Sequence, residues 1–151
     1  MKIVEITEVT DEVVAAFVRL TPQLAPTLPP PGRDRLARIA AGPGTVLFAA
    51  RDPDRGDEIV GVLTLAIYQI PTATRAWIED VVVDSSARGK GVGEALTRAA
   101  IDRARAAGAS AVDLTSRPSR EAANRLYQRI GFQLRETNCY RYPLAPKGSR
   151  P

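Results

Sequence analysis

The sequence contains no histidine and a single cysteine, Cys139, among its 151 residues. Without histidine the chain lacks the usual general base and the commonest zinc ligand, and a Ser-His or Cys-His nucleophile is excluded. One cysteine cannot form an internal disulfide. A metal site would need carboxylates alone, and we predict none. Proton transfer must therefore use Asp, Glu, Tyr, Lys, a terminal amine or water.

Long apolar segments are missing as well. No run approaches the roughly 18 residues of a membrane span, and the first residues, Met1 to Glu5, lack the apolar core of a signal peptide. We therefore expect a cytoplasmic protein without a membrane partner. Its length and its 44% hydrophobic content predict one domain with a real core over residues 1–144. Residues 145–151 are predicted to be a disordered tail.

The charge balance is basic, with a formal net charge of +4, but aromatic residues make up only 5% of the chain. The arginines are scattered, and no stretch interleaves basic and aromatic residues as nucleic-acid-binding surfaces do. We therefore expect no nucleic-acid partner. A solvated arginine-rich surface or a polyanionic cofactor accounts for the same charge.

Periodicity and turn residues predict alternating strands and helices. The stretch from Thr21 to Gly32 carries five prolines and is predicted to be a surface connection that cannot form a helix interior. The expected strands are 2–7, 45–50, 59–70, 75–83 and 111–115, with a final hairpin of 132–135 and 139–144. The expected helices are 11–20, 33–41, 94–107 and one capped by Ser119 that stops at Gly131.

A glycine-rich turn, Arg88 to Gly93, joins the strand ending at Val83 to a predicted amphipathic helix. A helix start leaves backbone N–H groups unpaired and carries a partial positive charge, and glycines allow close approach, so the pattern favours a bound phosphate. The spacing matches neither the dinucleotide fingerprint nor the phosphate-loop motif.

The pattern Arg-x-x-Gly-x-Gly at Arg88 to Gly93 resembles the acetyl-CoA loop of the GNAT superfamily of N-acetyltransferases. Asn124 to Phe132 resembles the second signature of that family, N-x-x-Y-x-x-x-G-F. The resemblance implies the α/β GNAT (acyl-CoA N-acyltransferase) fold, a mixed, splayed sheet with helices on both faces. It also implies that residues 1–144 form one N-acetyltransferase domain, which moves an acetyl group from acetyl-CoA to a primary amine by direct attack in a ternary complex.

The resemblance assigns roles to particular residues. Tyr127 would act as the general acid for the CoA thiolate, although a tyrosine at this place is otherwise read as a core aromatic. Asn124 would contact the cofactor arm, or else serve as a cap or surface residue. The residues expected to bind the cofactor are Val81, Val82, Val83, Arg88, Gly89, Lys90, Gly91, Val92, Gly93, Glu94 and Asn124.

Glu79 is the candidate general base, acting on the amine directly or through water. Strand alternation predicts that it shares a face with Val81, while Asp80 points the opposite way. The run from Glu79 to Val83 resembles the polyamine acetyltransferase branch, in which the matching glutamate lies at the acceptor site. A structural ion pair with an arginine is an equally favoured role for Glu79. Trp77 lies on the same face and is a weaker pocket candidate.

Several alternatives stay open. The acceptor is a polyamine, an aminoglycoside-like drug, an amino acid or a protein amine, with a small molecule favoured. A catalytically silent CoA-binding or regulatory module is the main alternative to an enzyme, and a basic nucleic-acid-binding domain is the less favoured one. A homodimer is neither predicted nor excluded.

Overall fold

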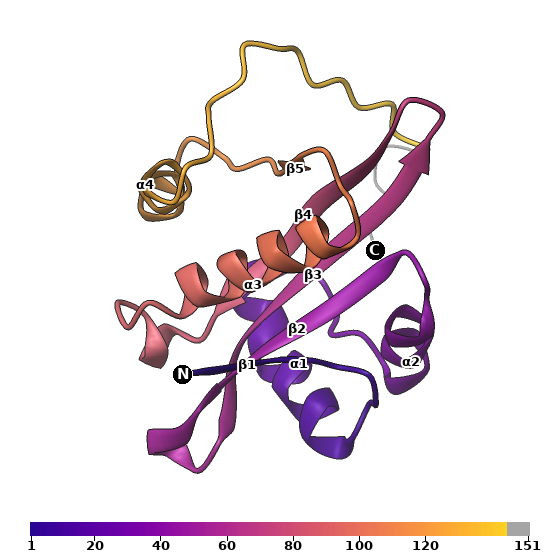
Figure 1. Ribbon diagram of the computed structural model, residues 1–151. Coiled ribbons are helices and arrows are strands. Elements are labelled where there is room, and N and C mark those ends of the chain that lie inside the picture. The colour runs from indigo at the N-terminus through magenta and orange to yellow at the C-terminus, as the bar shows by residue number, and fades with distance from the viewer. Residues whose placement is uncertain (145–151) are drawn as a thin grey trace. The chain divides into compact units, whose positions relative to one another are not determined.

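The computed structural model describes residues 1–144 (Figure 1). The chain divides into two compact units, one of residues 1–114 and one that begins at Thr115, and each is described by itself. The tail predicted at residues 145–151 lies outside the described residues.

The first unit is built on a five-stranded mixed sheet in the order β1-β2-β3-β4-β5. Its strands are β1 (Lys2–Glu5), β2 (Thr45–Asp52), β3 (Glu58–Ile70), β4 (Ala73–Val83) and β5 (Val112–Asp113). The first four strands pair antiparallel, whereas β5 pairs parallel to β4. A mixed sheet was expected, but β1 and β5 are shorter than predicted.

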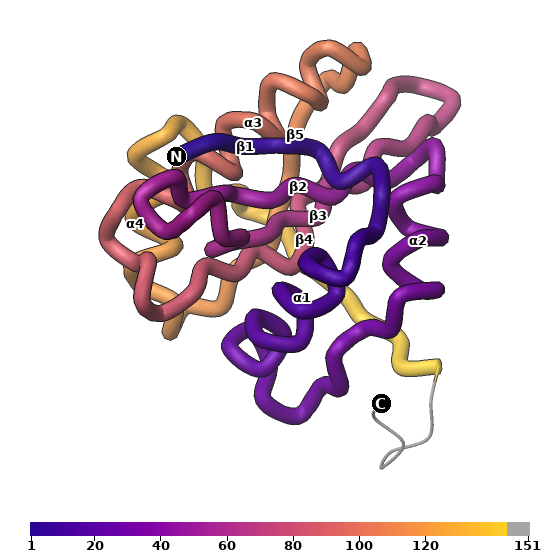
Figure 2. The backbone as a smooth tube through the Cα atoms, turned by 90° about the horizontal axis from the view of Figure 1, so that it is seen from below, coloured from indigo at the N-terminus to yellow at the C-terminus, as the bar shows by residue number. Residues whose placement is uncertain are grey.

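Helices cover both faces of this sheet, as predicted (Figure 2). On one face, α1 (Asp11–Leu24) and α2 (Arg33–Ala41) contribute Leu20 and Leu36 to a core cluster with strand residues such as Val62. On the other face lies α3 (Val92–Ala106). A Cβ on Gly61 of β3 would come within 3.2 Å of the Leu96 side chain, so the glycine lets α3 approach the sheet closely.

Helix α1 corrects the prediction for the proline-rich stretch, because it continues to Leu24 with Pro22 inside it. A proline removes one helical N–H donor and normally disfavours a helix interior. Here Pro22 lies in the last turn, where Ala25 N still donates to Thr21 O at 3.0 Å, and Leu24 packs against the core cluster. Burial of Leu24 therefore carries the helix past the proline.

Helix α3 begins two residues earlier than predicted, at Val92, because Gly91 serves as its N-cap residue. Val92, Leu96, Ala100 and Ala104 are buried, so the predicted apolar face is the one that packs on the sheet. The helix ends just before Gly108, which adopts a φ of 76°. A left-handed glycine after the last turn is a common helix ending.

The second unit contains α4 (Glu121–Arg129) followed by Gly131 at a φ of 108°. The predicted cap by Ser119 is wrong, because Arg120 occupies the N-cap position without a side-chain cap bond. The predicted final hairpin is also wrong, since residues 132–144 form no strand. Leu134 and Tyr140 are 91% and 88% exposed. A two-stranded hairpin that buries no apolar face is only marginally stable.

Within residues 1–144, no helix is long and apolar enough to cross a membrane.

Candidate active site

The open edge of β4 is the first element of the site. Pairing between β4 and β5 is confined to Ala76 with Val112 and Trp77 with Asp113. From Ile78 to Val83, β4 has no strand neighbour other than β3 in the described part of the chain. The backbone groups on that edge, including those of Val81, are therefore available to an extended ligand, as an unpaired strand edge generally is.

A β-bulge interrupts β4 just where it leaves β5. Val82 pairs with Val62 and Glu79 with Thr64, so Asp80 and Val81 together oppose a single residue of β3. Asp80 has a φ of 50°, a left-handed conformation that Asp tolerates better than most residues. Because paired residues share a face, Glu79 shares one with Val82 and not with Val81. The predicted alternation from Glu79 to Val81 is wrong, because the extra residue resets it.

The turn between β4 and α3 has the shape of an anion cradle. Gly89 and Gly91 have φ values of 76° and 77°, and a Cβ on either would meet nothing within 4 Å. No side chain caps the start of α3. The unpaired N–H groups of the first turn therefore face a ligand without competition from a capping oxygen.

The charged residues of the turn are exposed but loosely held. Arg88 Nε donates to Val83 O at 3.4 Å, and Lys90 Nζ lies 3.9 Å from the buried carboxylate of Asp52. Glu94, which was predicted to contact the cofactor, forms an ion pair with Arg98 at 2.9 Å. Arg88 and Lys90 can therefore turn toward a polyphosphate at small cost.

Two predicted cofactor residues are part of the core. The side chains of Val82 and Val92 are buried. Val82 lies on the sheet face that α1 covers, and Val92 lies on the sheet-facing side of α3, against Gly61. Only their backbone groups can contact a ligand. Gly93 lies in the first turn of α3, where its carbonyl accepts a bond from the Thr97 hydroxyl at 2.7 Å.

Asp84 fixes the start of the turn, and the sequence reasoning missed it. Its carboxylate, in a residue only 6% exposed, accepts bonds from Ser86 Oγ at 2.6 Å, Ser86 N at 3.0 Å and Arg19 Nε at 3.0 Å. These hydrogen bonds, led by that of the Ser86 hydroxyl, lower the pKa of Asp84 to about 2 against the opposing effect of burial. An aspartate followed by two serines directly after a strand was the available signal, because Asx turns use this pattern.

Helix α1 holds the same junction from the sheet face that it covers. Arg19 also forms an ion pair with Glu58 at 3.2 Å and donates to the carbonyl of Ile59. One turn later, Gln23 Oε1 accepts a bond from Ser85 N at 2.8 Å. We call Arg19, Gln23, Glu58 and Asp84 the junction network. It ties the glycine turn to a helix whose residues lie more than 60 positions away in the sequence.

Glu79 is exposed on the sheet face that α1 and α2 cover further along, and Trp77 on the same face is half-buried. Within residues 1–144, neither a hydrogen bond nor an ion pair holds the Glu79 carboxylate. The structural ion pair with an arginine, which was an equally favoured role, is not formed there.

Asn124 and Tyr127 lie one turn apart on α4 in the second unit. Asn124 Nδ2 donates to Arg117 O at 3.0 Å and to Pro118 O at 3.5 Å, which ties the helix to the segment before it. The Tyr127 ring packs edge-on against Phe132 with centroids 5.7 Å apart, and burial raises the pKa of its hydroxyl. Their roles toward the cofactor stay predictions.

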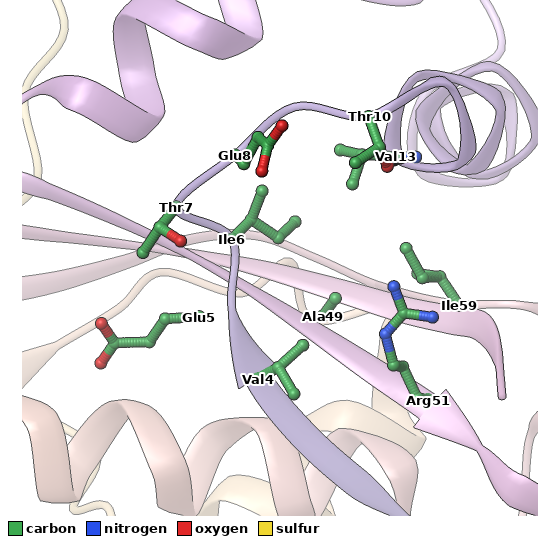
Figure 3. Close-up of a pocket in the computed structure, with 10 residues that line it drawn as sticks. All are labelled: Val4, Glu5, Ile6, Thr7, Glu8, Thr10, Val13, Ala49, Arg51 and Ile59. Atoms are coloured by element: carbon green, nitrogen blue, oxygen red, sulfur yellow. Dashed lines mark hydrogen bonds between the residues drawn. The ribbon is translucent and has the colours of Figure 1, made fainter.

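A pocket of about 140 Å³ lies beside β1 and the start of α1, and Figure 3 shows its lining. Arg51 is held there by Glu12, with two bonds of 2.8 Å to its carboxylate oxygens. None of the predicted site residues lines this pocket. Among the described residues, no group of three or more His, Cys, Asp or Glu is placed to hold a metal ion.

A mixed sheet that opens beside a glycine-rich helix start is the architecture of acyl-CoA-dependent transferases of the GNAT class. The model of the acetyltransferase (GNAT) family matches residues 8–132, so the chain belongs to this family. The family is one of acetyltransferases, and acetyl-CoA is its general donor.

The chain is similar to the following three proteins, among others. Mycothiol acetyltransferase of Renibacterium salmoninarum is 37% identical over 95 residues, which are 61% of this chain and 28% of that protein. The chain thus spans little more than a quarter of this relative. A transcriptional regulator from Bacillus halodurans C-125 is 27% identical with a TM-score of 0.77, covering 93% of this chain and 98% of its own. An acetyltransferase of Trypanosoma brucei is 26% identical with a TM-score of 0.74, covering 94% and 100%.

Proposed function

We propose that this chain is an acetyl-CoA-dependent N-acetyltransferase that moves an acetyl group to a primary amine by direct attack in a ternary complex. The acceptor is a small molecule, with a protein amine as the less favoured alternative, and the chain works as one domain in the cytoplasm. The observation that carries the proposal is the turn of Gly89 and Gly91 before α3, with its left-handed glycines, open space and uncapped helix start.

The donor would be held by backbone groups more than by side chains. The pyrophosphate fits the N–H groups around Gly89, Gly91 and Gly93, with Arg88 and Lys90 supplying charge. The pantetheine arm adds to the open edge of β4 along residues 81–83, as an extended ligand pairs with a free strand edge. The bulge at Asp80 and Val81 turns backbone N–H groups out of the ladder, where one can polarise the thioester oxygen.

The acceptor amine must lose a proton before it attacks. An amine with a pKa near 10.4 is neutral on the order of one time in a thousand at pH 7, so a base is needed. Glu79 suits this role because its carboxylate is exposed and holds no hydrogen bond or ion pair within residues 1–144. It would accept the proton through water. In the second half of the reaction Tyr127 would protonate the departing thiolate, and its raised pKa keeps that proton available at neutral pH.

Calorimetry with acetyl-CoA tests the donor half of the proposal. We expect micromolar binding that weakens at least about tenfold in Gly91→Ala, because the new methyl group enters the space of the phosphate. Gly56→Ala is the matched control, since Gly56 also has a left-handed φ, of 66°, and open space around it, but lies in another turn. Equal affinity of the two variants, or no binding by folded wild type, would remove the cradle.

A silent regulatory module is the second candidate, and the transcriptional regulator among the similar structures supports it. Release of CoA in the presence of an amine separates the two. A protein that binds acetyl-CoA but releases no CoA with any amine is the module and not the enzyme.

A further inference from the structure

Three alternate residues of β4, namely Arg75, Trp77 and Glu79, share one face of the sheet. Arg75 pairs with Tyr68, Trp77 with Ala66 and Glu79 with Thr64, so all three side chains of β4 stand on the face that α1 and α2 cover further along. Toward the β3–β4 turn this face is open enough to leave Tyr68 46% exposed. We call Arg75, Trp77 and Glu79 the acceptor row.

Arg75 is the member of the row that has a buried polar atom without a protein partner within residues 1–144. Its Nε is buried, yet it has no hydrogen-bond partner in the part of the chain that the structure describes. Most buried donors in proteins are paired, so an unpaired one calls for a partner such as an ordered water, an ion or a ligand. An arginine whose guanidinium has no partner among the described residues is suited to a carboxylate, which accepts two parallel N–H bonds.

The two charges of the row do not satisfy each other. Arg75 and Glu79 are four residues apart on one strand, about 13 Å between Cα atoms, and no ion pair joins them within residues 1–144. Trp77 stands between them and offers an apolar surface. The row therefore presents a cationic side chain, an apolar ring and an anionic side chain in a line.

We propose that the acceptor is an amine that also carries a carboxylate, with its carboxylate on Arg75, its carbon skeleton over Trp77 and its amine facing Glu79. This inference rests on the proposed N-acetyltransferase activity. It narrows the open list of acceptors, because a polyamine or an aminoglycoside would place a second positive charge against Arg75.

Three acceptors of equal length test the charge preference. The ω-amino acid aminohexanoate, its neutral amide and hexanediamine carry the same primary amine, with an anionic, a neutral or a cationic far end. The same three end groups on four-carbon and eight-carbon chains determine which acceptor length matches the distance between Arg75 and Glu79. With acetyl-CoA as donor, we expect kcat/KM for the best amino acid to exceed that for its amide at least about tenfold, as charged hydrogen bonds allow. The diamine should be the poorest of the three.

The variant Arg75→Gln should remove this preference, so that the amino acid and its neutral amide react with similar kcat/KM, and Arg75→Lys should restore part of it. Arg105→Gln is the matched control: Arg105 is a well-exposed arginine of α3, paired with Asp102, on the opposite face of the sheet. Thermal unfolding and acetyl-CoA affinity of each variant confirm that the fold and the donor site are intact. If Arg75→Gln does not fold, Arg75→Lys carries the test through its reduced selectivity.

The outcomes separate this inference from the proposed function. Turnover of amide and diamine as fast as the amino acid, or selectivity unchanged in Arg75→Gln, overturns the inference and leaves the N-acetyltransferase intact. Binding of the ω-amino acid is also measured by ligand-detected nuclear magnetic resonance in the presence of CoA. Arg75-dependent binding without release of CoA from any amine supports the acceptor row and overturns the enzyme. No binding of the ω-amino acid, with turnover of another amine, overturns only the inference, and neither binding nor turnover with any amine overturns both.

Discussion

Charged side chains in β4 and just after it behave in opposite ways. Directly after the strand, Asp84 is paired within the junction network, with bonds to Ser86 and Arg19. Within the strand, Arg75 Nε is buried without a hydrogen-bond partner, and Glu79 has no hydrogen bond or ion pair among the described residues. Paired charges hold a backbone in shape, while unpaired ones are available to a ligand. Substitution in the network should therefore change stability, and substitution of the unpaired groups should change kinetics.

The largest expected effect concerns Tyr127, which extends the comparison to the second unit. Tyr127→Phe should lower kcat about a thousandfold, within the range that a lost general acid produces, because the CoA thiolate would leave unprotonated. Acetyl-CoA affinity, measured by calorimetry, should be that of the wild type. Equal turnover in the variant would take Tyr127 out of the mechanism.

Glu79→Gln should lower kcat/KM at pH 7 about a hundredfold, since the amine would then lose its proton to bulk water alone. The free energy of unfolding should stay within about 0.5 kcal/mol of the wild type, because the carboxylate has no partner to lose. Asp80→Asn is the matched control, an adjacent exposed acid at the bulge that Asn can replace at positive φ. A pair of variants with the same turnover would assign deprotonation to water.

Asp84→Asn tests the paired end of the strand. A pKa near 2 in the fold against 3.8 in the unfolded chain means that Asp84 stabilises the fold by about 2 kcal/mol at neutral pH. As pH falls from about 4 to about 2, the unfolded state takes up the proton first, so this stabilisation is lost in the wild type. Urea unfolding at pH 7 should show the full difference between the proteins, and unfolding near pH 2 a much smaller one. A difference that is the same at both pH values would contradict the assignment.

The smallest effect is expected for Glu12→Gln, which breaks the pair with Arg51 beside the pocket of Figure 3. The hydrogen bond from Arg51 lowers the pKa of Glu12, but the Glu12 side chain is 49% exposed. Exposed ion pairs contribute less than about 1 kcal/mol, and salt screens them. Urea unfolding at low and high salt should give a small difference that shrinks with salt. A loss of unfolding free energy as large as that of Asp84→Asn would contradict the distinction between this exposed pair and the junction network.

The parts of the site that are local in sequence could be predicted. Gly89 and Gly91 stand beside a helix whose apolar face follows a simple period, so the turn and the packing of α3 were legible from neighbouring residues. Asp84 was not, because its partner Arg19 is 65 positions away and no local pattern names it. Likewise Pro22 stays helical only because Leu24 finds a core to join.

The bulge was out of reach for the same reason. Which residue is extra in β4 depends on its register with β3, a property of two strands together. A strict period of two predicts that Glu79 and Val81 share a sheet face. In the structure, Glu79 shares its face with Val82 instead. The prediction that Asp80 and Glu79 lie on opposite faces depends only on neighbouring residues.

The bulge at Asp80 and Val81 also determines which sheet face each side chain of β4 occupies, because it adds one residue to the alternation. With one residue deleted there, the strand would alternate without interruption, and its two halves could no longer both keep their present faces. Arg75, Trp77 and Glu79 would turn inward against α3, and Ala76 and Ile78 would turn out, although no side chain had been altered. A deletion at position 80 would therefore disturb the sheet more than a substitution by a residue that tolerates a positive φ, because only the deletion moves every side chain of one half to the other face.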